Sequence, residues 1–547
     1  MWPSNLLLSI AFLRTLRTFR GALAAPIHDK VDEIDNIHFD FIIVGGGTAG
    51  NVVANRLTEN PNFSVLVIEA GPSHEDILNS EVPFFAINNW FTQYDWNYTT
   101  VPQPGLGGKS AIIPRGHVLG GSSSINFLMY TRSTREDYDR IARITGDQGW
   151  SWNSLFPYFK KNEKFVLPAD RHNITGQFTP SVHGFKGPLA VSLPGFETPI
   201  DSKVVTATQQ LGGGFSYVED YNNGKPLGVG FLQVTMDENG RRASSATAYL
   251  APRYLKRPNL HVLVNAQVSR LIQTSRGKTP SFLTVEFRHR SRKRLVQLTA
   301  KKEVILSAGA IGSPHIMLNS GIGDAEALKA IGIKPLVDLP DVGQNLADHS
   351  AIANPFVALG NDTFERIRQP NVTAQLLKEW KKSGTGPLVN TVAISLIQKN
   401  GLIVPNAFVP PGQPIFSVAT AIVSPSSIGS LTINSTDPFA MPLIDLALLK
   451  EDSDRRMMRA ALRHAFKFLT APVWDDYVRG GAGDLAGATT DEQLDEYINA
   501  EAGTFFHPTG TAFMSPKGSK KGVLDPDLRV KKISGLRVVD ASVFVSA

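Results

Sequence analysis

The most regular pattern in the sequence is a short apolar run that leads directly into a glycine-rich turn. Phe39–Val44 is almost entirely apolar and has the length of a buried parallel strand. Gly45–Gly50 follows it, and Asn51–Leu57 then has the apolar spacing of a helix. A second apolar run, Ser64–Ile68, ends at Glu69. The order of strand, glycine turn, helix and strand predicts a βαβ unit near the start of the chain.

The glycine turn has the spacing of a dinucleotide-binding loop. Gly45, Gly47 and Gly50 occupy the three glycine positions of G-x-G-x-x-G. The first allows the tight turn, the second lets a pyrophosphate approach the backbone, and the third lets helix and strand pack closely. We therefore expect phosphates at the helix N-terminus. Glu69 lies at the distance at which an acidic side chain binds the ribose hydroxyls.

Later segments extend the predicted α/β architecture. Glu303–Ala308 and His261–Val264 have the pattern of strands, and Pro442–Leu448 is a strand-like run before Glu451–Leu469, which has helical spacing. A chain of 547 residues is too long for one compact core, which favours two domains.

The composition and the net charge limit the kinds of binding partner that we expect. The formal net charge is +6, but the basic residues are scattered. The one dense run, Arg288–Arg294, lies between the strand-like segments Phe282–Phe287 and Leu295–Leu298. We expect a solvated hairpin tip there and no nucleic-acid partner. The absence of cysteine excludes disulfides, thiolate metal sites and cysteine nucleophiles, and we expect no metal site.

The first residues have features of a secretion signal. Residues 1–25 contain the apolar run Leu6–Leu13 and small residues ahead of Pro26, although three intervening arginines leave a transit-like N-terminus as the alternative. Glycosylation triplets occur at Asn62, Asn97, Asn173, Asn361, Asn371 and Asn434. No other segment has the roughly 18 apolar residues that a membrane helix needs. We therefore expect a secreted protein without a membrane anchor.

Two longer motifs point to the cofactor. Pro114–Asn126 resembles the first signature of the glucose–methanol–choline (GMC) family of flavin oxidoreductases, and Gly309–Gly323 resembles the second along its whole length. Leu339–His349 continues the family pattern, and the resemblance runs from about Phe39 to the end of the chain. It implies FAD as cofactor. It also implies an α/β fold in which a Rossmann-type FAD-binding domain carries an inserted α+β substrate domain.

The resemblance divides the chain and assigns cofactor contacts. The FAD-binding domain would comprise residues 36–162, 224–349 and 501–547, and the substrate-binding domain residues 163–223 and 350–500. The glycine/serine loop would lie against the isoalloxazine, the Val268 backbone would receive the adenine, and Asp540 would face the ribityl–pyrophosphate region. The implied cofactor-binding residues are Gly45, Gly47, Thr48, Ala49, Gly50, Glu69, Ala70, Gly116, Gly120, Gly121, Ser122, Asn126, Val268, Ala308, Asp540 and Ala541. Some pyranose dehydrogenases attach the flavin through a histidine near the end of the first signature, where this chain has Asn126 and Phe127. We therefore expect FAD to be bound non-covalently.

Within the family, three segments are similar to aryl-alcohol oxidases: Asp95–Thr100, Gly146–Trp152 and Phe505–Thr511. His507, in the last of them, matches the motif histidine that acts as general base beside flavin N5. Phe506 resembles the aromatic that narrows the oxygen side of the site, and Phe127 one that stacks on the incoming ring. We expect both to contact substrate, because such a lining favours an aromatic alcohol.

The sequence departs from the family pattern in two places. After the position of Ser542, family members continue into a loop with a second active-site histidine or asparagine and a final helix, whereas this sequence reads Val543–Ala547. We therefore expect that hydrogen-bonding partner to be absent, at a cost on the order of 10²–10³ in rate. The entrance loop of aryl-alcohol oxidases is replaced by a short proline-rich bridge, Asn406–Pro414.

Three functions stay open on sequence alone. The first is oxidation of benzylic or allylic alcohols to aldehydes, with O2 reduced to hydrogen peroxide. The second is a sugar or alcohol dehydrogenase that passes electrons to quinones. The third is a family member without redox turnover, either a hydroxynitrile lyase or an inactive paralogue. In each case we expect a monomer and a small-molecule substrate.

Overall fold

The structure is a computed structural model that describes residues 27–35, 37–360, 363, 364, 367, 369–390, 395–399, 402–406 and 414–545. The expected leader, residues 1–25, and most of the proline-rich bridge lie outside these ranges. In the described part of the chain, no helix is both long and apolar enough to cross a membrane.

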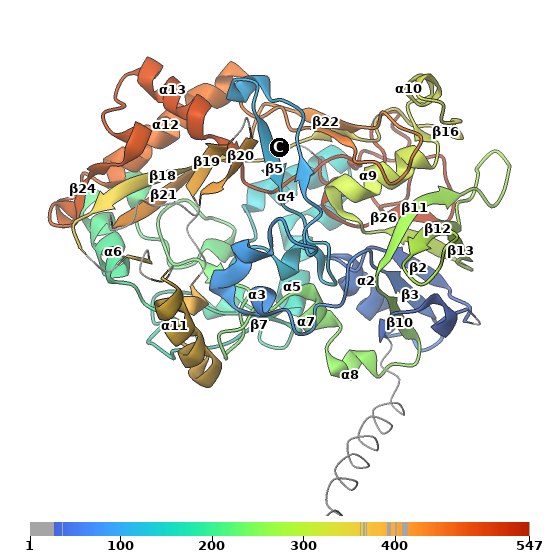
Figure 1. Ribbon diagram of the computed structural model, residues 1–547, viewed down its shortest axis with the longest axis horizontal. Helices are drawn as coiled ribbons and strands as arrows, with labels where there is room; N and C mark the ends of the chain where they lie inside the picture. The colour runs from blue at the N-terminus through green and yellow to red at the C-terminus, as the bar shows by residue number, and fades with distance from the viewer. Residues whose placement is uncertain are drawn as a thin grey trace, which may run out of the picture.

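A six-stranded parallel sheet organises one half of the molecule, at the lower right of Figure 1. Its strands, in spatial order, are β1 (Ile27–His28), β10 (Leu260–Leu263), β3 (Val65–Ile68), β2 (Phe41–Val44), β14 (Glu303–Leu306) and β26 (Leu536–Val538). Every residue of β2 and β3 is buried, as expected for strands covered on both faces. The predicted Rossmann-type architecture is confirmed.

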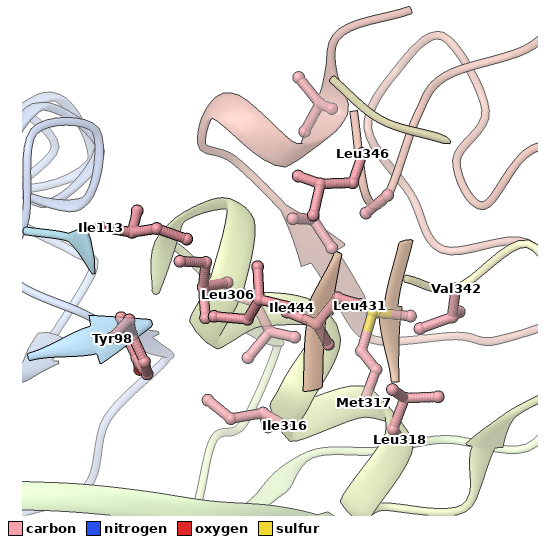
Figure 2. Close-up of a cluster of buried hydrophobic side chains, with 14 of the residues drawn as sticks. Tyr98, Ile113, Leu306, Ile316, Met317, Leu318, Val342, Leu346, Leu431 and Ile444 are labelled. Atoms are coloured by element: carbon pink, nitrogen blue, oxygen red, sulfur yellow. The ribbon is translucent and has the colours of Figure 1, made fainter. Parts of the chain in front are cut away.

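Two helices that follow central strands begin at the same edge of this sheet. α2 (Gly50–Leu57) connects β2 to β3, and α9 (Gly309–Asn319) follows β14. α9 is apolar on nearly all sides and is largely buried. Its Ile316, Met317 and Leu318 pack toward Leu431 and Ile444 of two neighbouring strands, as Figure 2 shows. The helix is therefore fixed from both sides, and its N-terminus is held at the sheet edge.

A second, antiparallel sheet lies at the left of Figure 1. Its strands are β18 (Ser350–Ala358), β21 (Ile415–Ile422), β24 (Val478–Gly481) and β25 (Gly503–Thr504), and each of the other three pairs with β18. α12 (Asp452–Phe468) packs on β21, and α13 (Asp491–Glu501) packs on α12. This is the α+β region that the sequence predicts.

The domain boundaries stay a prediction. Apart from β1, the strands of the parallel sheet lie in the three pieces 36–162, 224–349 and 501–547. β25 lies in the last of these pieces yet pairs with β18, so the two sheets are joined close to the proposed boundary at residue 500.

The remaining elements form small sheets and connecting helices. The strands are β4 (Tyr98–Thr99), β5 (Ser110–Ile113), β6 (Met129–Tyr130), β7 (Glu163–Phe165), β8 (Leu189–Val191), β9 (Gln233–Val234), β11 (Ala266–Ile272), β12 (Thr284–His289), β13 (Val296–Thr299), β15 (Ile322–Gly323), β16 (Val337–Asp338), β17 (Gln344–Leu346), β19 (Ser395–Lys399), β20 (Leu402–Asn406), β22 (Gly429–Thr432) and β23 (Leu443–Asp445). The helices are α3 (Leu78–Glu81), α4 (Arg135–Thr145), α5 (Trp152–Asn162), α6 (Pro199–Leu211), α7 (Ser245–Tyr249), α8 (Pro252–Leu255), α10 (Ala325–Ala330) and α11 (Pro370–Ser383).

The basic run forms the predicted hairpin tip between β12 and β13, but its arginines are also paired. Arg290 forms an ion pair with Asp29, and Arg292 forms ion pairs with Asp32 and Asp35. The tip therefore neutralises an acidic segment of the same chain, in addition to facing solvent.

A buried charge network is formed by residues between β6 and β9. Glu163 accepts hydrogen bonds from Arg132 and from His183 Nδ1, the latter at 2.5 Å, and His183 Nε2 donates to Asp220 at 2.7 Å. All four side chains are buried. The two carboxylates outweigh the effect of burial and raise the pKa of His183 above its usual value.

Replacing His183 by glutamine should destabilise the protein by about 3–5 kcal/mol, because it leaves the buried Asp220 without its cation and Glu163 with Arg132 alone. The folded pKa of His183 is raised, so its contribution should be complete below the unfolded pKa of about 6.5 and decline as pH rises through the folded value. Urea unfolding at several pH values measures both effects. His172→Gln, which removes the surface pair with Asp170, is the matched control. An equal effect of the two variants would contradict the prediction.

Candidate active site

A cavity of about 620 Å³ opens where the parallel strands end, and we call it the first cavity. The residues that follow β2, β3, β14 and β26 all reach it, and ligands bind at this edge in open α/β sheets. From these four strand ends it is lined by Gly45, Glu69, Ala308 and Asp540.

The glycine loop leaves no space for side chains where it meets the sheet. Gly45 has φ +102°, and a Cβ there would lie 2.5 Å from the Ser307 carbonyl oxygen. A Cβ on Gly50 would lie 2.0 Å from the Gly45 carbonyl oxygen, so this glycine allows α2 to pack against the turn. At Gly47 a Cβ would meet protein atoms only at 3.8 Å or more. The second glycine is therefore not required by packing, which fits a position that a ligand approaches.

No side chain caps the N-terminus of α2, whose first amides are available to an anion. At α9 the corresponding amide is already engaged, because Gly309 N–H donates to the Asp540 carboxylate at 2.9 Å. Asp540 also accepts hydrogen bonds from Ser313 and Ser542, and burial raises its pKa. The helix end that can receive a phosphate is that of α2.

Glu69 is held by the loop that it helps to shape. One carboxylate oxygen accepts from Gly46 N–H and the other from Gly71 N–H, both at 2.8 Å. Burial raises the pKa of Glu69 to about 7, against the effect of these amides. Each oxygen keeps a further acceptor position, and the side chain lines the first cavity, where ribose hydroxyls are expected.

The residues of the first cavity fit FAD. Thirteen of the sixteen predicted cofactor residues line it: Gly45, Gly47, Thr48, Ala49, Glu69, Ala70, Gly116, Gly121, Ser122, Val268, Ala308, Asp540 and Ala541. Gly50 and Gly120 do not line it and serve loop packing instead. Asn126 lies in a neighbouring cavity. An uncapped helix end, an acidic side chain and a small-residue wall match the pyrophosphate, ribose and flat ring of the cofactor.

This neighbouring second cavity has a volume of about 420 Å³ and an aromatic wall. Phe127 and Phe506 both line it, as the sequence predicts. Trp90 lies between them, with its ring centroid 5.7 Å from Phe127 and 5.1 Å from Phe506 in edge-to-face contacts. The two cavities share Thr48, Arg115, Ser122, Pro508 and Ala541, so they adjoin.

His507 lies in the second cavity on a turn that Asp348 organises. Asp348 Oδ1 accepts hydrogen bonds from His507 N–H and His349 N–H, both at 2.8 Å, and its other oxygen accepts from the Thr504 hydroxyl. Thr504 Oγ1 in turn accepts from Phe506 N–H at 2.8 Å. These bonds stabilise Phe506 at φ +66°, a conformation that costs a bulky residue about 1–3 kcal/mol.

The electrostatic surroundings keep His507 neutral. Its ring is exposed to the cavity, yet the surrounding protein is dense, and this burial, together with His349 and Arg115, lowers its pKa well below the usual value. Water in the cavity screens part of the effect. Because the pKa of His507 is lowered, its imidazole is neutral at pH 7, and the neutral form is the one that accepts a proton.

Arg115 is a cation at the junction of the two cavities. Its Nε donates to the Pro114 carbonyl at 2.8 Å, and within the described residues its guanidinium forms no salt bridge. Burial lowers its pKa, partly offset by Asp348 and Asp95, but an arginine stays protonated at pH 7. Arg115 therefore supplies positive charge that no adjacent carboxylate neutralises directly.

A second buried arginine supports the loop that carries Phe127. Arg242 donates to the carbonyls of Ser80 and Ser123 and to Asn126 Oδ1, the last at 2.7 Å. Asn126 Oδ1 also accepts from Leu128 N–H, so this side chain shapes the turn around Phe127. The Asn126 side-chain oxygen is therefore engaged within the protein, and the predicted cofactor contact of Asn126 stays a prediction.

This fold and site define a flavin-dependent oxidoreductase. Family models described as "GMC oxidoreductase" match residues 39–351 and 425–547, and the chain belongs to this family, whose members are flavoproteins that use FAD. It is 38% identical to Dehydrogenase eriK of Hericium erinaceus, covering 98% of this chain and 95% of the relative. It is 38% identical to pyranose dehydrogenase 3 of Leucoagaricus meleagris, covering 98% and 93%. The solved structure of a fungal aryl-alcohol oxidase aligns with TM-score 0.76 and 26% identity over 93% of this chain and 95% of that one.

Four site residues carried no sequence prediction of function: Trp90, Arg115, Asp348 and His349. Arg115, Asp348 and His349 lie within the quoted family motifs, which was the available signal. His349 ends the motif Leu339–His349, and only the structure shows that its ring contacts His507. Trp90 had no motif to mark it, and only packing places it between the two phenylalanines.

Gly47→Ala should preserve the fold but weaken FAD binding, because its methyl group has space among protein atoms and would obstruct only a ligand. We expect the Kd to rise at least about tenfold, equivalent to about 1.4 kcal/mol. Flavin content after purification and titration of the apoprotein with FAD measure this. Gly277→Ala, at a site with no neighbours within 4 Å, is the control. Unchanged affinity at residue 47 would contradict the assignment of the first cavity.

Proposed function

We propose that this protein oxidises primary alcohols attached to an aromatic or allylic group to the corresponding aldehydes, with O2 as electron acceptor and hydrogen peroxide as product. The observation that carries the proposal is the second cavity, in which a neutral His507 lies beside an aromatic wall and adjoins the predicted FAD site. Family membership supports action on alcohols or sugars.

The aromatic wall favours a flat apolar substrate. Trp90, Phe127 and Phe506 meet edge to face, an arrangement that leaves ring faces and edges to an incoming aromatic group. Offset or edge-to-face contact with such a ring contributes about 0.5–1.5 kcal/mol beyond area burial. A bound ring in this cavity would also exclude water from His507.

His507 is the proposed general base for the alcohol hydroxyl. Its lowered pKa keeps the accepting nitrogen unprotonated, and Asp348 fixes the backbone that carries it. Arg115, at the junction of the cavities, would stabilise negative charge on the substrate oxygen as the proton leaves. When bound, FAD supplies the acceptor for the hydride that leaves the same carbon.

FAD is proposed to be held non-covalently, by the α2 N-terminus at the pyrophosphate, Glu69 at the ribose, the Val268 backbone at the adenine and the Gly116–Ser122 loop at the ring. Asn126 and Phe127, the positions next to this loop, offer no nucleophilic side chain for a flavin bond.

A second candidate is dehydrogenation of a sugar with a quinone as acceptor. It is favoured by the relatives at 37–39% identity, four of which are named pyranose dehydrogenases. Asn126, Ser123 and Thr504 add polar groups to the second cavity that sugar hydroxyls could use.

We further propose that the protein is secreted, glycosylated and monomeric. Five of the six glycosylation triplets lie in the described chain, and their asparagines, Asn62, Asn97, Asn173, Asn371 and Asn434, are all exposed. Glycosidase treatment of protein secreted by a fungal host, followed by mass measurement, tests the first two points, and light scattering tests the third.

His507→Asn should slow anaerobic reduction of the bound flavin by benzyl alcohol by about 10²–10⁴-fold without loss of flavin, because only the base is removed. Stopped-flow absorption measures the rate, and flavin released by acid precipitation reports both content and non-covalent attachment. The control is His464→Asn, on a histidine that stacks on Phe215 away from both cavities. An unimpaired His507 variant would refute the assigned base.

Parallel assays with benzyl alcohol and D-glucose, each with O2 and with benzoquinone, identify the substrate and the electron acceptor. Peroxide formed from benzyl alcohol supports the first function, whereas turnover of glucose with quinone only supports the second. Cleavage of mandelonitrile with no bleaching of the flavin would show a lyase instead.

The rate of flavin reduction should stay constant as pH falls from 8 through the ordinary histidine pKa of about 6.5. The pKa of His507 is lowered, so the base becomes protonated, and the rate falls, only below that value. Stopped-flow measurements across this pH range test whether the rate falls only below the ordinary histidine pKa. A midpoint at or above 6.5 would contradict it.

A further inference from the structure

His349 directly precedes β18 and contacts the proposed base, which follows the paired strand β25. It lies between β17 and β18, and its carbonyl accepts a hydrogen bond from Phe505 N–H at 2.8 Å. Its ring Nδ1 lies 3.1 Å from His507 Nδ1, with the two ring planes at 86°. The ring-to-ring contact is thus a directed hydrogen bond between two nitrogens.

One of these two nitrogens must donate and the other must accept. Each neutral imidazole carries a single N–H, so the partner of the remaining nitrogen decides which ring donates. The partner of the remaining nitrogen is clear for His507, because its ring lines the second cavity, where the alcohol is proposed to bind.

The positions of the ring hydrogens on His507 and His349 follow from this contact and from the proposed role of His507. His507 Nε2 is the proposed base and therefore carries no hydrogen, which puts the single N–H of the neutral ring on Nδ1, the nitrogen that faces His349 Nδ1. His507 Nδ1–H then donates to His349, and His507 Nε2 keeps a free lone pair. Within the described chain, His507 Nε2 has no hydrogen-bond partner, and the ring lines the second cavity.

We propose that His349 is a positioning residue that holds His507 in the tautomer with hydrogen on Nδ1, so that Nε2 faces the substrate as the base. This inference rests on the proposed role of His507. The same hydrogen bond persists after His507 accepts a proton at Nε2, because Nδ1–H still donates. It becomes stronger then, since the donor is charged.

Among the described residues, no other group forms a hydrogen bond with a ring nitrogen of His507. Asp348 accepts hydrogen bonds from the Thr504 hydroxyl and from the backbone N–H groups of His349 and His507, and in the described part of the chain it forms none with the His507 ring. Arg115 acts on His507 through its charge alone. A neutral imidazole as partner also differs from a carboxylate in its effect, because a carboxylate would raise the pKa of His507 whereas His349 lowers it.

The proposal is tested with His349→Phe, which removes the ring nitrogens, and His349→Gln, which can again place an amide donor and an oxygen acceptor in the cavity wall. We expect the rate of flavin reduction by benzyl alcohol to fall about 10²-fold in the phenylalanine variant and to recover to within about tenfold of wild type in the glutamine variant. Flavin content and melting temperature should be unchanged, and His464→Gln serves as the control. Equal rates in wild type and His349→Phe, or equal loss in both variants, would overturn the proposal.

Nitrogen NMR of holoprotein labelled with ¹⁵N-histidine provides a readout that is independent of turnover. The His507 signals, assigned by comparison with His507→Asn, should show a protonated Nδ1 and a bare Nε2 in wild type, and a mixture of tautomers in His349→Phe. A bare Nδ1 in wild type would overturn the inference. If instead His507→Asn still reduces flavin normally, the proposed base is wrong whatever the tautomer, so the two failures are distinct.

Discussion

The structure depends on a close approach of backbone to backbone at the carboxyl edge of the parallel sheet. The turn after β2 lies against the end of β14, with Gly45 directly over the Ser307 carbonyl, and α2 begins on that same turn. Side chains at these positions would separate the strands, so the contact requires glycine. Because β3 and β26 end beside it, one tight junction brings a helix terminus, a buried glutamate and Asp540 to a single cavity.

The antiparallel sheet supports the active site through buried hydrogen bonds. Asp348, just ahead of β18, connects to the segment that carries His507 by two hydrogen bonds, from the Thr504 hydroxyl and His507 N–H, and β25 pairs with β18 next to it. An unsatisfied buried carboxylate would be costly, which makes these bonds mutually dependent. The Thr504 hydroxyl that donates to Asp348 also accepts from Phe506 N–H, and this helps to hold Phe506 in its left-handed conformation.

Local sequence patterns predicted the helices and strands well. They predicted contacts between residues that are distant in the sequence poorly. The apolar runs and glycine spacing located β2, α2 and β3 to within two residues, because strand period and turn geometry are local properties. The two phenylalanines of the second cavity followed from family motifs. The pairing of His349 with His507 spans 158 positions, and no local pattern encodes it. The role of Arg115 was equally hard to predict, since only tertiary structure shows that its guanidinium lies between two cavities and forms no salt bridge with the described residues.

The shared wall of the two cavities has a thermodynamic consequence. Thr48, Arg115, Ser122, Pro508 and Ala541 line both spaces, so a molecule in one changes the surface presented to the other. Linkage makes such an effect reciprocal: by whatever factor the bound cofactor changes the affinity for an alcohol, the alcohol must change the affinity for the cofactor. A non-reacting aromatic acid held near Arg115 would thus slow or hasten flavin loss on heating, and the size of that change would measure the coupling across a wall of five residues.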